Sequence, residues 1–326
     1  MDFSFSDDQI MFQEAVRDLL ANECPPEVVR AAWENNTGRS DGLWEALADM
    51  GVVGMTAPES AGGLGMDETD LVLLLEEAGR AALPEPLLEH TAVGIPTLAE
   101  AGGPVAEAWL GRAASGEATL GAGPVGGYTV GAATCDLVFL IGEQVRVVSV
   151  DEATLVEHRS VDGSRRLFEV DGEAVDIDAD PALAFDRAAG AAAAQCVGVA
   201  QYLLDATVDY VAQRYQFGKP VGSYQAVKHH LANAALKIEF ARPATRHAAW
   251  CIATGDPDRS RDVSLAKALA SEAVDLAART ALQCHGAIGY TYEYDLHLWM
   301  KRGWALSAAW GDAAWHRNRI AVALGI

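Results

Sequence analysis

The sequence is short of basic residues, aromatic residues and cysteine. Lys and Arg number 24 against 46 acidic residues, which gives a net charge of −22 over 326 residues. A surface of this charge repels nucleic acid and anionic lipid, so we expect neither as a partner. The five cysteines are scattered and form no Cys-x-x-Cys pair. This pattern predicts reduced thiols, a cytoplasmic location and no metal site.

Long apolar runs are also missing. Gly, Asp or Glu interrupts every candidate before it reaches the roughly 20 residues of a membrane span, so we expect no membrane insertion. The opening MDFSFSDDQI is acidic where a secretory leader is basic, so we expect no leader. Small apolar residues are abundant instead, with 50% of the chain hydrophobic and only 7% aromatic. This composition predicts closely packed helices around a large core.

Helical patterns dominate the first part of the chain. Ser6 and Gln9 form a capping box, and an apolar stripe at helical spacing begins at Phe12. A second predicted helix carries Trp44 and ends near Gly51. After a Gly/Pro-rich loop at 56–69, helical spacing is predicted again at 71–82 and 90–113.

The periodicity changes near residue 119. Short β-prone runs punctuated by Gly and Asp replace the helical spacing, and they predict a small antiparallel sheet. The runs are 128–130, 136–141, 145–150 and 166–170. Helical spacing returns from Pro181 onward. The predicted fold is therefore mainly α with a small β segment in the middle.

The predicted order of helices, sheet and helices resembles that of the acyl-CoA dehydrogenase family, and four segments are similar to segments of that family. They are PESAGGLGM (58–66), SRRLFEVDGEAV (164–175), RYQFGKPVGSYQAVKHHLA (214–232) and QCHGAIGYTYEYDLHLWMKR (283–302). The last two are similar to the family's RxxFGxxxxxxQ and QxxGGxGyxxEyp motifs. The resemblance covers nearly the whole chain. It implies an N-terminal helical domain (1–118), a reduced antiparallel β domain (119–180) and a C-terminal four-helix bundle (181–326).

The resemblance also implies a reaction and a cofactor. In this family a carboxylate removes the α-proton of an acyl-CoA thioester, and FAD accepts the β-hydride. The base is a Glu at one of two positions. Ungapped matching puts Trp310 at the first position, and Ala188, followed by Ala189, at the second. Because these side chains cannot accept a proton, we expect no catalytic residue in this chain. Asp312, two residues after Trp310, should point away from the flavin if the helix continues.

The flavin-binding motifs of the family are only partly present. The TEPxxGSD-like segment that binds the isoalloxazine ring has no counterpart in Thr119–Gly127. The two segments that family members extend to a neighbour's FAD are retained. Arg214 matches the Arg that faces the pyrophosphate, Gln216 and Phe217 match its flanking contacts, and Gln283, Gly286 and Ala287 match the loop near the adenosine.

The resemblance thus implies a base-lacking subunit, similar to the small chains of actinobacterial steroid-catabolic dehydrogenases. Such a chain is expected to join a catalytic sister subunit in an α2β2 tetramer, to act on an acyl-CoA such as a steroid side-chain ester, and to pass electrons to an electron-transfer flavoprotein or similar acceptor. Two alternatives stay open. One is a self-sufficient homo-oligomer with an unconventional base, and the other is a non-enzymatic binding protein on the same fold. The further carboxylates considered as bases are Glu239, Glu272 and Glu293.

Overall fold

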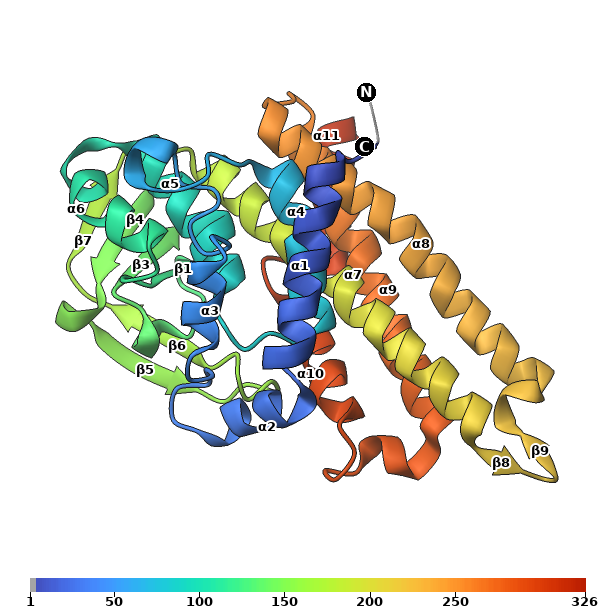
Figure 1. Ribbon diagram of the computed structural model, residues 1–326. Coiled ribbons are helices and arrows are strands. Elements are labelled where there is room, and N and C mark those ends of the chain that lie inside the picture. The colour runs from blue at the N-terminus through green and yellow to red at the C-terminus, as the bar shows by residue number, and fades with distance from the viewer. Residues whose placement is uncertain (1–3) are drawn as a thin grey trace.

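A computed structural model describes residues 4–326 as a helical body with a β segment at one side (Figure 1). The N-terminal helices are α1 (Asp7–Glu23), α2 (Pro26–Glu34), α3 (Leu43–Asp49), α4 (Glu68–Arg80), the π-helix η2 (Leu88–Gly94), α5 (Ile95–Ala101) and α6 (Gly103–Ala114). The capping box is confirmed, because Ser6 Oγ accepts from Gln9 N and Gln9 Oε1 accepts from Ser6 N. Helix α2 was not predicted. Among the described helices, none combines the length and apolarity that a bilayer crossing requires.

The β segment consists of two small sheets. One has the order β1 (Leu120–Pro124), β3 (Leu137–Ile141), β4 (Val145–Ser149) and β7 (Ala174–Ile177), and the other has β2 (Thr129–Val130), β6 (Leu167–Asp171) and β5 (Thr154–His158). All four predicted runs form strands, so the predicted β segment is confirmed. The pairs within these sheets are antiparallel except β1 with β3, which run parallel. The parallel pair arises because the chain leaves β1 for the second sheet and then re-enters the first.

Three long helices form the C-terminal bundle. They are α7 (Pro181–Gln213), α8 (Gln225–Thr254) and α9 (Arg259–His285), followed by α10 (Leu296–Ala308) and α11 (Ala313–Leu324). Small residues let α7 approach α4 closely. A Cβ added at Gly198 would lie 1.9 Å from Glu76 O, and one added at Gly79 would lie 2.1 Å from Gln195 O. The N-terminal helices therefore lie directly against the bundle.

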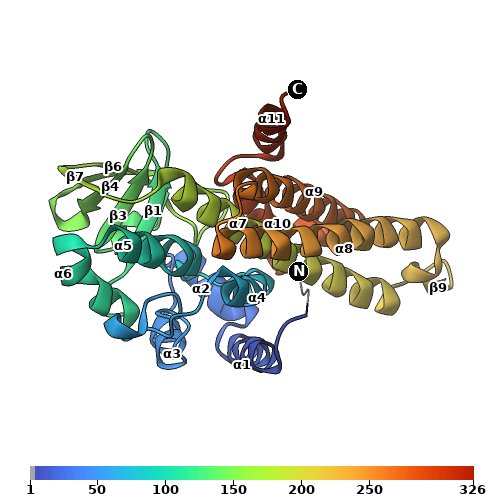
Figure 2. The same cartoon turned by 90° about the horizontal axis from the view of Figure 1, so that it is seen from above.

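A short hairpin connects α7 to α8 at the far end of the bundle. Its strands are β8 (Tyr215–Gln216) and β9 (Lys219–Pro220). Both views place this hairpin at the end of the bundle opposite the sheets (Figures 1 and 2). One hydrophobic core extends from Val16 to Trp310 through all parts of the chain. The division into three domains stays a prediction.

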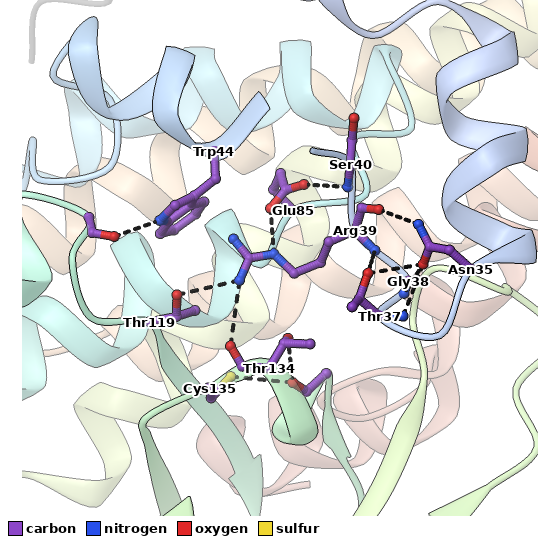
Figure 3. A network of polar contacts seen from close by, with 12 residues as sticks. Asn35, Thr37, Gly38, Arg39, Ser40, Trp44, Glu85, Thr119, Thr134 and Cys135 are labelled. Atoms are coloured by element: carbon purple, nitrogen blue, oxygen red, sulfur yellow. Dashed lines mark hydrogen bonds and ion pairs between the residues drawn. The ribbon is translucent and has the colours of Figure 1, made fainter. Parts of the chain in front are cut away.

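Arg39 joins the N-terminal helices to the β segment (Figure 3). Its Nε donates to Glu85 Oε2 at 2.6 Å, and the backbone N of Ser40 donates to Glu85 Oε1 at 2.9 Å. On its other side the guanidinium donates to Thr119 Oγ1 at 3.4 Å, where the β segment begins. It also lies 4.9 Å from the centre of the Trp44 ring. The fully buried Glu85 carboxylate is therefore paired on both oxygens.

Arg302 of α10 joins all three parts of the fold. Its guanidinium forms an ion pair with Asp162 and donates to Ser164 Oγ at 2.7 Å, both in the loop before β6. It also donates to Leu83 O at 2.8 Å, just after α4. The Arg302 and Asp162 side chains are 2% and 0% exposed. A charge buried this deeply is strongly destabilising without its partner.

We therefore expect Arg302→Met to lower the free energy of unfolding by about 3–5 kcal/mol, because it leaves the Asp162 carboxylate buried and unpaired. Urea denaturation followed by circular dichroism measures the loss. Arg302→Met combined with Asp162→Leu should recover most of it, since no charge is then left unpaired. The matched control is Arg166→Ala, which breaks an exposed pair with Glu157 and should cost far less. Equal losses for the two arginines would contradict the prediction.

Candidate functional site

A pocket of about 760 Å³ lies between the β segment and the turn that connects α10 to α11. The loop before β6 contributes Arg159 and Arg165, and strand β1 contributes Ala122. The opposite wall is aromatic and consists of Phe185, Trp304, Trp310 and Trp315. The ring centre of Phe185 lies 5.9 Å from that of Trp310 and 5.2 Å from that of Trp315. Residues from α7, α10 and α11 thus build one continuous apolar wall.

Two buried side chains hold the turn between α10 and α11 by hydrogen bonds to its backbone carbonyls. Lys267 Nζ donates to Gly311 O at 2.9 Å and to Ser307 O at 3.0 Å. His316 Nε2 donates to Trp310 O at 2.9 Å. Burial lowers the pKa of Lys267, and it lowers the pKa of His316 to about 4. Trp310 adopts φ +55°, a conformation that is rare for a residue with a Cβ. The surrounding hydrogen bonds therefore fix the Trp310 side chain in the pocket wall.

Asp312 does not lie on a continuation of the helix that carries Trp304, as the sequence argument assumed. Helix α10 ends at Ala308, and Trp310 and Gly311 both have positive φ, so no helix continues through this segment. Asp312 is instead the N-cap of α11, where its carboxylate accepts from Trp315 N at 2.8 Å. The assumption of a continuous helix was wrong because of this left-handed turn, while the expectation that Asp312 points away from the flavin stays a prediction. The carboxylate is exposed and engaged in the cap.

The two predicted base positions have different environments. Trp310 is 8% exposed and lines the pocket, as a residue at the first position should. Ala188 and Ala189 are fully buried within α7 and do not line the pocket. That this chain has no catalytic base stays a prediction.

One carboxylate in the pocket was missed by sequence reasoning. Glu89 of η2 is 1% exposed and accepts from Arg165 NH2 at 2.8 Å through Oε1. Its Oε2 is buried without a hydrogen-bond partner among the described residues. The signal in the sequence was an acidic residue inside the apolar run PLLEHTAVG, which was interpreted only as helical spacing.

His90 fixes the helix that carries Glu89. Its Nδ1 accepts from Leu120 N at 3.0 Å, so the proton lies on Nε2, which donates to Ala113 O at 3.1 Å. Burial lowers the pKa of His90 to about 3. The neutral ring therefore links η2 to the first strand of the sheet and to the end of α6.

The six residues predicted to contact FAD lie together at the far end of the bundle, away from the pocket. Arg214 caps α7, Gln216 and Phe217 lie in the hairpin, Gln283 is in the last turn of α9, and Gly286 and Ala287 begin η6 (Gly286–Tyr290). The Tyr210 and His285 rings stack with centres 4.1 Å apart, which brings the ends of α7 and α9 side by side. All six residues are exposed, and Phe217 is 92% exposed. Their role in FAD binding stays a prediction.

This end of the bundle is basic although the protein is acidic. No Asp or Glu occurs between Asp209 and Glu239, whereas four Lys and Arg residues do. Within residues 4–326, no hydrogen bond or ion pair engages the Arg214 guanidinium. The backbone at Gly286 is open, because an added Cβ would meet nothing within 4 Å. A free guanidinium and an accessible backbone fit the phosphates of a dinucleotide such as FAD.

The sequence predicted no metal site, and the structure brings one group of possible ligands together. Side chains of His247 and Cys251 on α8 and Asp262 on α9 lie within 4.8 Å of one another. Both oxygens of Asp262 already accept from Arg261, at 2.8 and 3.1 Å. The carboxylate is therefore part of an ion pair.

Comparisons with known proteins agree across the chain. Residues 6–117 match the profile of the acyl-CoA dehydrogenase N-terminal domain, and residues 181–325 match that of the C-terminal domain. Acyl-CoA dehydrogenase IpdE2 of Mycobacterium tuberculosis is 34% identical over 90% of this chain and 89% of its own length. The fold matches the ChsE4–ChsE5 complex from Mycobacterium tuberculosis with a TM-score of 0.90, at 24% identity, over 100% of this chain and 99% of the other. It matches the Tcur3481–Tcur3483 steroid ACAD G363A variant with a TM-score of 0.89, at 24% identity, over 98% of each chain.

The buried histidines predict that acid destabilises the fold. The pKa values of His90 and His316 are lowered to about 3 and about 4, whereas an unfolded histidine titrates near 6.5. The unfolded chain therefore binds protons that the folded chain does not, so this stability is present above pH 6.5 and is lost as the pH falls. Each histidine should contribute a slope of about 1.4 kcal/mol per pH unit between its two pKa values.

Urea denaturation at pH 7.5, 6.0 and 5.0 measures how the free energy of unfolding changes with pH. His316→Gln should reduce this slope by about 1.4 kcal/mol per pH unit, the contribution of one histidine. The control is His229→Gln, because His229 is exposed at the start of α8. An unchanged slope in His316→Gln, or an equal reduction in the control, would contradict the assignment.

Proposed function

The chain belongs to the acyl-CoA dehydrogenase family, whose cofactor is FAD, and on this premise we propose that it is the non-catalytic subunit of a heteromeric dehydrogenase. A sister subunit supplies the glutamate base, and this chain supplies part of the sister's FAD site. The observation that carries the proposal is that the predicted base position and the predicted FAD contacts lie at opposite ends of this chain's bundle. Trp310 walls the pocket at the predicted base position, whereas the predicted FAD contacts lie exposed at the other end of the bundle.

Arg214 and Gly286 have complementary roles in this proposal. The Arg214 guanidinium donates to the pyrophosphate, and a hydrogen bond of this charged kind contributes roughly 1.5–3 kcal/mol. Gly286, at φ +68°, lets the backbone approach the adenosine without a side chain between them. Bound FAD supplies the hydride acceptor for the sister's reaction. This chain thus contributes binding and orientation to the cofactor, and the sister contributes the proton transfer.

The same end of the molecule is suited to contact another subunit. Phe217 and Gly218 both have positive φ, and this tight turn projects the Phe217 ring into solvent. Exposed apolar clusters of this kind mark protein interfaces. The exposed apolar side chains of the hairpin, η6 and the neighbouring helices are Val208, Tyr215, Phe217, Leu236, Phe240, Ile288 and Tyr290. We place the sister subunit on this surface, in an α2β2 assembly.

Two structural relatives support the choice of substrate and partner. One relative is a complex of two different chains, and another is a steroid ACAD built from a pair of chains. We therefore propose a steroid-derived acyl-CoA thioester as substrate, oxidised between its α and β carbons. Electrons then pass to an electron-transfer flavoprotein or a similar acceptor in the cytoplasm.

Glu89 favours one alternative, a self-sufficient dehydrogenase with an unconventional base. It is the one carboxylate among the described residues that line the pocket. Its ion pair with Arg165 weighs against this role, because proton transfer would leave the buried guanidinium without its partner. Of the carboxylates considered earlier, Glu239 pairs with Arg242 and Glu272 pairs with Lys237, and Glu293 is exposed and does not line the pocket.

We expect the chain produced alone to lack FAD, and the chain co-produced with its sister to give a yellow complex. An obligate interface buries on the order of 2,000–5,000 Å², so the isolated chain should also tend to aggregate. Flavin absorbance measures the FAD content, and anaerobic bleaching by the acyl-CoA measures the reaction. Replacing the sister's glutamate should abolish bleaching by the complex. A yellow chain that bleaches alone would instead establish the self-sufficient alternative.

Arg214→Ala should lower the FAD content of the complex and its melting temperature. A ligand at about 100 times its dissociation constant stabilises a protein by roughly 2.7 kcal/mol, and weaker FAD binding removes part of this. Flavin absorbance per complex and thermal unfolding give the two readouts. The matched control is Arg112→Ala, an exposed arginine in α6 at the opposite side of the molecule. Full FAD retention in Arg214→Ala would show that the interface has been misplaced.

A further inference from the structure

The pocket beside Trp310 contains a buried hydrogen-bond acceptor that the proposed function does not use. We propose that this pocket is a non-catalytic binding site for a neutral, apolar ring compound with a hydroxyl group. The hydroxyl donates a hydrogen bond to Glu89 Oε2, and the rings lie against the tryptophan wall. The site is distinct from the FAD-binding surface at the far end of the bundle.

The pocket has the size and surface of a small-molecule site. Its volume of about 760 Å³ lies within the ~300–1,000 Å³ that is typical of such sites. Trp304, Trp310, Trp315 and Phe185 line one side, and the Phe185 ring packs against those of Trp310 and Trp315. Flat aromatic walls favour the faces and edges of fused rings over a flexible chain, because stacking adds to the burial of apolar area.

Glu89 supplies the polar contact that gives such a site its specificity. Glu89 lines the pocket, its side chain is 1% exposed, and its Oε2 is buried without a hydrogen-bond partner among the described residues. A buried polar atom without a partner is costly, so a donor from a ligand would be favoured there. Arg165 fixes the carboxylate by donating to Oε1 at 2.8 Å and leaves Oε2 without a partner.

The charges around Glu89 decide which donor fits. The lining contains two guanidinium groups, from Arg159 and Arg165, and one carboxylate. A cationic ligand would meet this positive excess, so an ammonium group is disfavoured. An anionic group would be repelled by Glu89 at the inner contact. A neutral hydroxyl can donate to Oε2 without either cost.

The hydrogen bond can be tested with two compounds that differ in one donor. 2-Naphthol carries a hydroxyl, and 2-methoxynaphthalene has the same rings with a methoxy group that cannot donate. Titration calorimetry of the full chain, in complex with its sister, gives both dissociation constants. We expect 2-naphthol to bind at least tenfold more tightly, because hydrogen bonds to a charged acceptor are among the stronger ones. Quenching of tryptophan fluorescence should accompany binding.

Three variants localise the effect to this pocket. Glu89→Gln keeps the shape but puts an amide in place of the carboxylate, so the preference for 2-naphthol should fall to near onefold. Ala308→Phe places a ring in the pocket lining from α10, leaves the Glu89 carboxylate in the sequence, and should abolish binding of both compounds. Glu293→Gln removes an exposed carboxylate outside the pocket and should leave the preference intact.

Equal binding of the two compounds to the unaltered protein would overturn the proposal, as would a preference that persists in both Glu89→Gln and Ala308→Phe. If Glu89→Gln fails to fold, the comparison of the two compounds and the Ala308→Phe variant still decide the matter. These outcomes are separate from those for the FAD-dependent reaction, which is measured by flavin bleaching. A flavin-free or inactive complex would leave the naphthol result standing.

Discussion

The arrangement of the N-terminal helices, the β segment and α10 depends on the contacts of the buried Arg302 guanidinium. It binds Asp162 and Ser164 in the loop before β6, and Leu83 O just after α4. Because a buried charge must stay paired, the loop cannot move relative to α10 without a large cost. The same loop carries Arg165, which fixes Glu89, and α10 carries Trp304 and leads to Trp310. One ion pair therefore sets the distance between the polar and aromatic walls of the pocket.

Close packing of small residues fixes the position of α7, the helix that extends from the pocket to the hairpin. Gly198 and Gly79 allow α7 to lie directly against α4, so α7 is held at the pocket end by the N-terminal helices. Its other end extends to the hairpin, which both views place away from the sheets. The stacked Tyr210 and His285 rings align the ends of α7 and α9 there. The bundle thus presents a basic, exposed surface at one end and an aromatic pocket at the other.

The parts of the fold that could be predicted were those with strong local signals. The long helices and four strands follow from apolar spacing, and the capping box follows from Ser6 and Gln9. Strand β1 was missed because LGAGP has no β-branched residue. Its extended conformation comes from pairing with β3. The turn at Trp310 was missed because its left-handed conformation depends on Lys267 and His316, which lie far away in the sequence or in the next helix. Glu89 was missed for the same reason, since its partner Arg165 is 76 residues away.

Buried polar side chains hold the turn at Trp310 and so fix this part of the pocket wall. A residue with a Cβ at φ +55° is strained, and such conformations cost of order 1–3 kcal/mol unless the surroundings fix them. Here a fully buried lysine and a fully buried histidine hold the turn through Gly311 O and Trp310 O. Burying an ammonium group is itself costly, and it is tolerated because three acceptors surround it. A turn that carried no function would need neither the strain nor the buried charge. The fixed indole instead completes the apolar wall of a pocket that Glu89 also lines, an arrangement that suits the proposed ring compound.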